Sequence, residues 1–134
     1  MKKLGKTILI IEDEKPLLEL LSSKLQFEGF DTTLADNGKD ALQIALEKHP
    51  DLILLDIIIP QMDGITMLKQ LRKDEWGQSV PVIVLTNLSS GETVVAAEES
   101  GVRDFLTKTD WKVSELVDKI KNALNIRTED ELAV

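Results

Sequence analysis

Residues that bear carboxylate, hydroxyl, amide or amine groups stand at the ends of four apolar segments of the sequence. They are Glu12, Asp13, Glu14, Asp56, Thr86, Asn87, Thr107 and Lys108. Crowded carboxylates repel one another and raise each other's pKa unless a cation lies among them. An Asp carboxylate is also a nucleophile that can form an aspartyl-phosphate, with a lysine and a hydroxyl group binding the phosphoryl oxygens.

The available side chains restrict the kind of cation. The sequence contains no cysteine and one histidine, which excludes disulfides, thiolate metal sites and a histidine relay. A cation held by carboxylates is then a hard one, and Mg2+ bound by carboxylates, water and a phosphate fits. Taken singly, each residue has an ordinary role in a turn, a cap or a helix dipole. Because the residues end four different segments, we interpret them together as a magnesium-dependent phosphoryl-transfer site.

The segments that carry these residues are short runs rich in Ile, Leu and Val. Such runs, without alternation of polar residues, are typical of strands buried on both faces of a parallel sheet. We therefore expect strands at 7–11, 31–35, 52–59, 80–85 and 105–107.

Stretches with helical spacing of apolar residues follow each strand. The first begins near Pro16 and ends at Gly29, since proline is favoured in the first helical turn. The fourth opens with Ser89 and Glu92 at capping-box spacing, and the fifth has Asp110 as its expected cap.

Five alternating strand–helix units predict an α/β fold, because a closed barrel needs about eight. We expect an open, doubly wound, five-stranded parallel sheet with five helices and the flavodoxin-like strand order 2-1-3-4-5. Ligands of such sheets bind at the carboxyl ends of the strands, where the polar residues above are placed.

Length and charge set further limits. The 134 residues suit one domain over 1–125 followed by a polar C-terminal tail over 126–134. A net charge of −8 argues against direct nucleic-acid binding, which depends on Lys and Arg. No apolar run approaches the roughly 20 residues of a membrane helix, and the N-terminus lacks a signal-peptide pattern. We expect a cytoplasmic protein that does not bind membranes.

Four segments of the chain together resemble the receiver domain of two-component response regulators. They are residues 8–14 (ILIIEDE), 51–64 (DLILLDIIIPQMDG), 82–86 (VIVLT) and 104–108 (DFLTK). The resemblance covers about residues 6–125, and the domain over 1–125 is accordingly expected to be a receiver domain.

The resemblance implies a magnesium site. Asp13 matches the carboxylate that binds Mg2+ directly, and Glu12 matches a second acidic position that usually acts through water. Asp56 and the backbone carbonyl of Ile58 would complete the metal ligands from the protein.

The resemblance also implies roles in phosphorylation. Asp56 matches the phosphoacceptor, Thr86 the switch hydroxyl that moves toward the phosphoryl group, and Lys108 the lysine that pairs with it. Phe105 matches an aromatic residue that turns inward on activation, although ordinary core packing also explains an apolar side chain there.

The implied function is that of a signalling phosphoacceptor, not of an enzyme with a separate substrate. A sensor histidine kinase or a phosphotransfer protein would donate a phosphoryl group to Asp56. The surface of the fourth helix, fifth strand and fifth helix would then change shape and act on a downstream effector protein or domain. Such a domain catalyses only its own phosphorylation and dephosphorylation. The sequence leaves a homodimer open.

Two positions depart from the family pattern. Asn87 stands where a small residue is usual, which narrows access to the phosphoryl group. Thr109 stands where proline usually follows a cis bond, so the Lys108–Thr109 bond is either trans or strained.

Proteins of other functions share this fold or a similar sheet. A pseudo-receiver would share the fold and act as a docking module without phosphotransfer. A flavin carrier or a P-loop nucleotidase needs a phosphate-binding loop that is absent after the first strand. A haloacid-dehalogenase-type phosphatase needs a second Asp where Ile58 stands.

Overall fold

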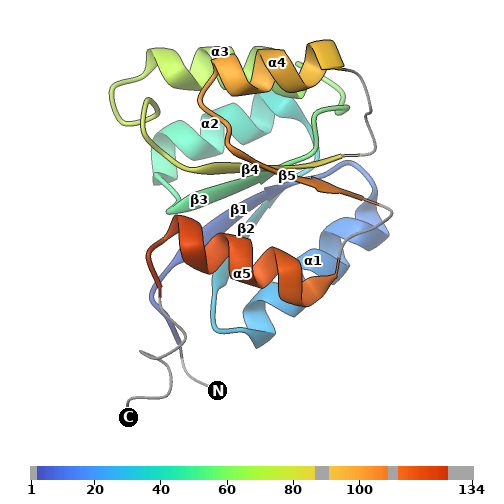
Figure 1. Ribbon diagram of the computed structural model, residues 1–134, viewed down its shortest axis with the longest axis vertical. Coiled ribbons are helices and arrows are strands. Elements are labelled where there is room, and N and C mark those ends of the chain that lie inside the picture. The colour runs from blue at the N-terminus through green and yellow to red at the C-terminus, as the bar shows by residue number, and fades with distance from the viewer. Residues whose placement is uncertain (1–2, 87–90, 109–111, 127–134) are drawn as a thin grey trace.

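The computed structural model describes residues 3–86, 91–108 and 112–126. Strands and helices alternate through the chain (Figure 1). The strands are β1 Thr7–Ile11, β2 Asp31–Ala35, β3 Leu52–Leu55, β4 Val82–Thr86 and β5 Asp104–Thr107. The helices are α1 Lys15–Phe27, α2 Gly38–Lys48, α3 Gly64–Lys73, α4 Gly91–Glu99 and α5 Val113–Ala123.

The sheet confirms the predicted topology. Its five strands are all parallel and lie in the order β2-β1-β3-β4-β5. Helices α1 and α5 cover one face of the sheet, and α2, α3 and α4 cover the other (Figure 1). The fold is therefore the open, doubly wound α/β sandwich that the alternating segments predict.

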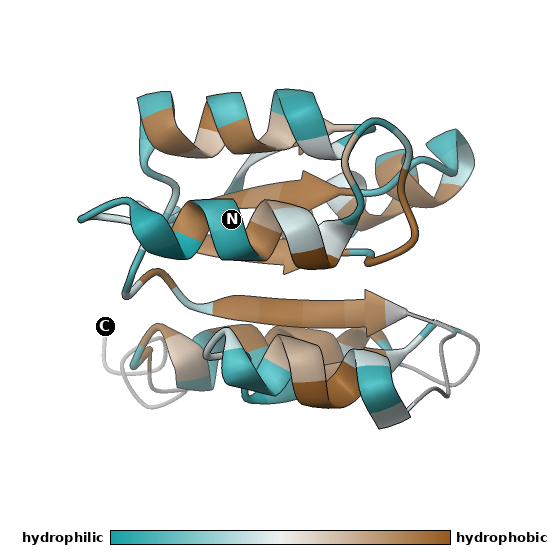
Figure 2. Cartoon of the chain, turned by 90° about the horizontal axis from the view of Figure 1, so that it is seen from above, coloured by the Kyte–Doolittle hydropathy of each residue, from teal (hydrophilic) through white to brown (hydrophobic). Residues whose placement is uncertain are grey.

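Burial on both faces explains the unbroken apolar runs. In β1, Ile8 and Ile10 pack toward α1 and α5, while Leu9 and Ile11 pack toward α2, α3 and α4. All four side chains are at most 1% exposed. Strands β1, β3 and β4 are almost entirely apolar, whereas the helices turn polar residues outward (Figure 2), as burial of apolar surface requires.

The predicted limits of three strands need correction. The third strand ends at Leu55 instead of residue 59, the fourth covers Val82–Thr86 instead of 80–85, and the fifth begins at Asp104 instead of residue 105. Ile57 and Ile59 are 5% and 7% exposed, so they are buried as parts of a loop. An apolar run predicts that its residues are buried, but it does not distinguish a strand from a buried loop.

Helix ends are partly as predicted. Gly29 ends α1 with a φ of 101°, and its N–H donates to the carbonyl of Gln26, the arrangement that favours glycine after a helix. The N-cap residue of α5 is Lys112, which makes no side-chain capping bond. The prediction of Asp110 as the cap is therefore wrong, and Asp110 and Ser89 lie outside the described residues.

In the described part of the chain, none of the helices combines the length and apolar character of a membrane span.

Candidate functional site

The register of β1 and β3 brings two carboxylates together. Ile11 pairs with Leu55, so the next residues, Glu12 and Asp56, leave the sheet side by side. Their amides continue the hydrogen bonding, because Asp56 N–H donates to Ile11 O at 3.0 Å. Glu12 is 2% exposed and Asp56 5%, so both acidic groups are withdrawn from water.

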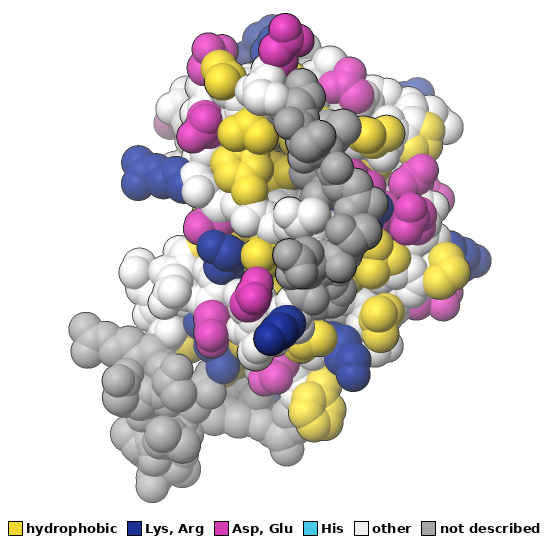
Figure 3. All heavy atoms as spheres, turned by 45° about the vertical axis from the view of Figure 1, so that its right-hand side comes forward, with side chains coloured by type: hydrophobic (Ala, Val, Ile, Leu, Met, Phe, Trp, Pro, Cys, Tyr) yellow, Lys and Arg dark blue, Asp and Glu magenta, His cyan; other side chains and the backbone are white. Residues whose placement is uncertain are grey.

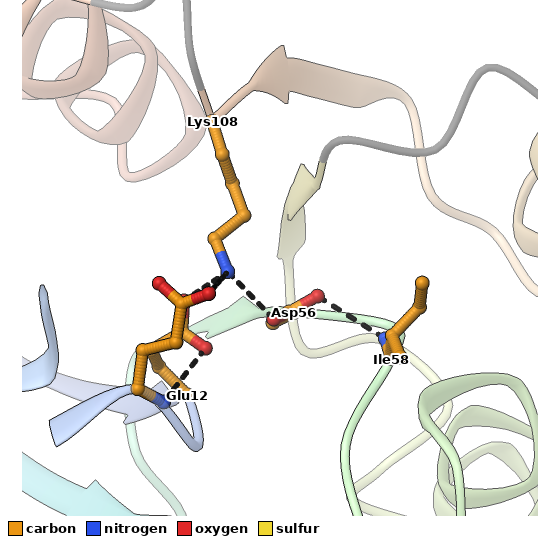
Figure 4. A network of polar contacts seen from close by, with 5 residues as sticks. Glu12, Asp56, Ile58 and Lys108 are labelled. Atoms are coloured by element: carbon orange, nitrogen blue, oxygen red, sulfur yellow. Dashed lines mark hydrogen bonds and ion pairs between the residues drawn. The ribbon is translucent and has the colours of Figure 1, made fainter.

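Lys108 supplies the cation for this pair. It follows β5, and its Nζ lies 2.6 Å from Glu12 Oε1 and 3.0 Å from Asp56 Oδ2 (Figure 4). Glu14 contributes a third carboxylate at 3.7 Å. The side chain of Lys108 is only 8% exposed, so little water screens these ion pairs.

The pKa of Glu12 is raised to about 7, chiefly because the side chain is buried. Lys108 opposes this rise, while Asp56 adds to it through its hydrogen bond and its negative charge. Burial lowers the pKa of Lys108, but its contacts with Glu12 and Asp56 outweigh burial and the net shift is upward. Lys108 is thus firmly cationic, whereas Glu12 takes up a proton near neutral pH.

The carboxylates also suit a divalent cation. One oxygen each from Glu12, Asp13 and Asp56 lie within 4.8 Å of one another. Asp13 is exposed, whereas Glu12 and Asp56 are buried, and Glu12 Oε1 has the Lys108 ammonium as its neighbour. Two buried carboxylates beside an exposed one fit the oxygen-rich coordination of Mg2+.

Ile58 lies next to this cluster. Its backbone N–H donates to Asp56 Oδ1 at 3.1 Å (Figure 4), which leaves Oδ2 to Lys108. The side chain of Ile58 is 60% exposed. On the side of the molecule that Figure 3 turns forward, acidic, basic and apolar side chains are interspersed. The two oxygens of Asp56 are therefore held in different, fixed environments.

The comparison with known families agrees with this geometry. The model of the response regulator receiver domain matches residues 8–121. The chain belongs to the response regulator receiver domain family. The match includes every predicted site residue of this receiver domain, from Glu12 to Lys108.

Curated relatives of this receiver domain are longer proteins. It is 38% identical to the DNA-binding response regulator MtrA of Mycolicibacterium smegmatis, over 99% of this chain and 56% of that protein. It is 35% identical to the phosphate regulon transcriptional regulatory protein PhoB of Pseudomonas aeruginosa, over 90% and 52%. The chain spans about half the length of these relatives.

Solved structures share the fold. The receiver domain of the Francisella response regulator 1452 is 33% identical with a TM-score of 0.81, over 90% of this chain and 98% of that one. The receiver domain of the sensor histidine kinase PA1611 of Pseudomonas aeruginosa, which has a magnesium ion coordinated in its active site cleft, is 28% identical with a TM-score of 0.83, over 90% and 98%.

Thr86 and Phe105 are the two residues of the receiver domain that are predicted to act as a switch. Thr86 ends β4 and pairs with Thr107, but its side chain lies outside the described part, so its hydroxyl role stays a prediction. Phe105 is half-buried and packs on the core beneath α2, α3 and α4. Asn87 and Thr109 lie outside the described residues.

One feature near the site was not predicted from the sequence. The loop of residues 56–63, called here the β3–α3 loop, rests on the start of α2 through backbone hydrogen bonds from Gly38 and Lys39. The dipeptide Asn37-Gly38 is a signal for a helix start after a cap residue, but the sequence does not show what the helix start contacts.

Proposed function

We propose that this receiver domain accepts a phosphoryl group on Asp56 and that Glu12, Asp13, Asp56 and the Ile58 carbonyl hold the Mg2+ ion that the reaction needs. The observation that carries the proposal is the position of Lys108, 3.0 Å from Asp56 and 2.6 Å from Glu12 at the carboxyl edge of the sheet. When bound, Mg2+ would neutralise negative charge on the transferring phosphoryl group.

Residues of this chain supply the nucleophile, a positive charge for the phosphoryl oxygens and the orientation of the attacking carboxylate. A carboxylate oxygen of Asp56 attacks phosphorus, the P–N bond of a phosphohistidine on a partner breaks, and the imidazole leaves with the bond electrons. Lys108 pairs with the phosphoryl oxygens, as a point charge does in phosphate sites. The Ile58 N–H bond to Asp56 Oδ1 fixes the carboxylate in one orientation, which lowers the entropic cost of the attack.

In this proposal, the charge that phosphorylation adds changes the surface that binds the effector. Phosphorylation brings about −1.5 to −2 of charge and strong acceptor oxygens. In the proposal, Thr86 moves toward the phosphoryl group and Phe105 turns inward, and the surface of α4, β5 and α5 shifts between two packings. Because Phe105 has no hydroxyl, it signals by volume alone.

We assign as partners a sensor histidine kinase or phosphotransfer protein upstream and an effector protein or domain downstream, in the cytoplasm. The relative MtrA, which is named a DNA-binding response regulator, suggests a DNA-binding effector. The charge of −8 on this chain supports the view that the receiver domain itself does not contact nucleic acid. A homodimer is one form that the output can take.

Phosphorylation of Asp56 is tested with Mg2+ and acetyl phosphate. We expect a mass gain of one phosphoryl group that is lost in Asp56→Asn and retained in Asp118→Asn, an exposed position on α5. Beryllofluoride, which mimics the phosphoryl group, should give slow-exchange fluorine resonances only with an intact Asp56. No mass gain and no fluorine signal in the wild-type protein would favour a pseudo-receiver that acts as a docking module.

A further inference from the structure

The first turn of α2 contacts the β3–α3 loop, which carries the proposed phosphorylation site. We propose that Gly38 and Lys39 are positioning residues of this site, because they fix the loop that presents Asp56 and the Ile58 carbonyl. The inference rests on the proposed function and adds to it a part of the fold that contains none of the proposed metal ligands.

Backbone hydrogen bonds join the two segments. Gly38 N–H donates to Pro60 O at 3.1 Å, and Lys39 N–H donates to Gln61 O at 2.7 Å. The first amides of a helix have no carbonyl partner within it. Here the loop supplies two of those partners, and Asn37 Oδ1 supplies a third by accepting from Asp40 N–H. The loop and the helix start therefore satisfy each other.

Position 38 has no room for a side chain. A Cβ atom there would lie 1.8 Å from Met62 O and 2.8 Å from Met62 C. Both are backbone atoms, so no side-chain rotation relieves the contact. Any residue other than glycine at position 38 must push the loop away from α2.

The loop conformation depends on this support. Gln61 and Met62 follow each other with φ angles of 48° and 82°, a region that non-glycine residues rarely occupy. Two such residues in succession are strained, and strain of this kind persists only where surrounding contacts hold it. Release from α2 would let this segment relax toward ordinary backbone angles.

A shift of the loop reaches the site directly. Only Ile59 separates Pro60, which accepts from Gly38, from Ile58. Ile58 N–H orients Asp56 Oδ1. On the other side of this segment, Gly64 N–H donates to Ile57 O at 2.9 Å. The segment between these two supports is short, so displacement at Pro60 moves Ile58.

The first test compares Gly38→Ala with Gly91→Ala. Both glycines are the first residues of their helices, but a Cβ at Gly91 meets nothing within 4 Å. With MgCl2 alone, in calorimetric titration, we expect Gly38→Ala to raise the Kd about tenfold or more, as loss of outer-shell support does at metal sites. The Kd of Gly91→Ala for Mg2+ should stay within about twofold of the wild-type value, because this substitution removes no support from the site.

A second pair tests one hydrogen bond. Lys39→Pro removes the N–H that donates to Gln61 O and is compatible with the first helical turn. Lys39→Ala removes the side chain but retains that N–H. We expect weaker Mg2+ binding in Lys39→Pro only. This pair decides the question if Gly38→Ala does not fold.

Amide hydrogen exchange gives a readout without metal. In Gly38→Ala we expect faster exchange at Ile58, since its carboxylate partner loses its fixed position. In the wild-type protein, Mg2+ should slow exchange at Gly38 and Lys39, because coupling between two sites is reciprocal.

The outcomes separate the two proposals. Wild-type Mg2+ affinity and unchanged Ile58 exchange in folded Gly38→Ala would overturn the inference while leaving phosphorylation of Asp56 in place. Wild-type protein that binds no Mg2+ would overturn the proposed function and this inference with it.

Discussion

Nζ of Lys108 lies 3.0 Å from Oδ2 of Asp56 and joins the last strand of the sheet to the third. Glu12, at the end of the first strand, shares the same cation. A buried cation between two buried carboxylates compensates charges that would otherwise be costly to withdraw from water.

Lys108→Met should therefore destabilise the protein. It removes the cation and retains much of the apolar stem, leaving Glu12 and Asp56 to repel each other in a site where they are 2% and 5% exposed. We expect the free energy of unfolding to fall by about 3 kcal/mol in metal-free buffer at neutral pH. Mg2+ should restore part of this loss, since it replaces the missing charge.

The control for Lys108→Met is Lys119→Met. Lys119 lies 3.7 Å from Asp104, with the two side chains 35% and 40% exposed, and exposed pairs contribute less than about 1 kcal/mol. Urea unfolding followed by circular dichroism measures both variants. Equal stability of the two variants would show that the Lys108 cation does not compensate the buried carboxylates.

Asp56→Asn should lower the pKa of Glu12. Asp56 raises that pKa both by hydrogen bonding and by its negative charge, and the amide removes the charge while keeping the shape. Titration of the Glu12 side-chain carboxyl carbon by NMR measures the shift. An unchanged or higher pKa would mean that the two carboxylates do not interact as their positions indicate.

Mg2+ binding should weaken as the pH falls through about 7, the pKa of Glu12. The proton and the metal compete for the same carboxylate, so between about pH 8 and pH 6 the affinity should drop about tenfold. Glu12→Gln should remove this dependence, and calorimetry at several pH values would detect it. A pH-independent wild-type affinity would contradict the role of Glu12.

Without metal, the contribution of Glu12 to the free energy of unfolding should decrease as the pH rises. The pKa of Glu12 is about 7 in the folded protein and 4.5 in the unfolded chain, so the folded state binds the proton more tightly. The contribution is fully present below 4.5 and is lost as the pH rises through 7. Comparing the unfolding free energy of Glu12→Gln with that of wild type across this window isolates it.

Arg72 should be required for stability and not replaceable by lysine. Its Nε donates to Ser100 O, and its Nη1 donates to Gly77 O and Val80 O, each at 2.7 Å. We expect Arg72→Lys and Arg72→Met both to cost about 2–3 kcal/mol, because one ammonium cannot span these carbonyls.

Thermal unfolding checks the Arg72 variants against Arg103→Lys. Arg103 is exposed, and such surface substitutions usually change stability by about 0.5 kcal/mol or less. Wild-type stability in Arg72→Lys would mean that charge alone, and not the geometry of the guanidinium, holds the three carbonyls.

The fold could be predicted because burial on both faces marks the central strands, such as β1 and β3. The uniformly apolar β1 and β3 identify central strands, and their alternation with helices leaves few topologies. The end of β3 was misjudged because Ile57 and Ile59 are buried in a loop. The start of α5 was misjudged because Asp110 is a favourable cap type, whereas Lys112 occupies the cap position.

The site could be predicted from residue type and strand position together. Glu12, Asp56 and Lys108 meet because β1 and β3 end in register and β5 ends at the same edge. The dominant cause of the Glu12 pKa was not foreseen, since burial outweighs repulsion between carboxylates. The role of Gly38 depends on a backbone oxygen of Met62, and no local pattern reports such a contact.

The order of the strands along the chain has a consequence for biosynthesis. The ribosome completes the segments that carry Glu12 and Asp56 long before it reaches Lys108. A nascent chain that stops short of β5 lacks this lysine and also lacks Leu106, Leu116, Val117 and Ile120, which complete the core on one face of the sheet. A fragment of residues 1–103 should therefore remain largely unstructured by circular dichroism, and native-like ellipticity in that fragment would contradict this order of events.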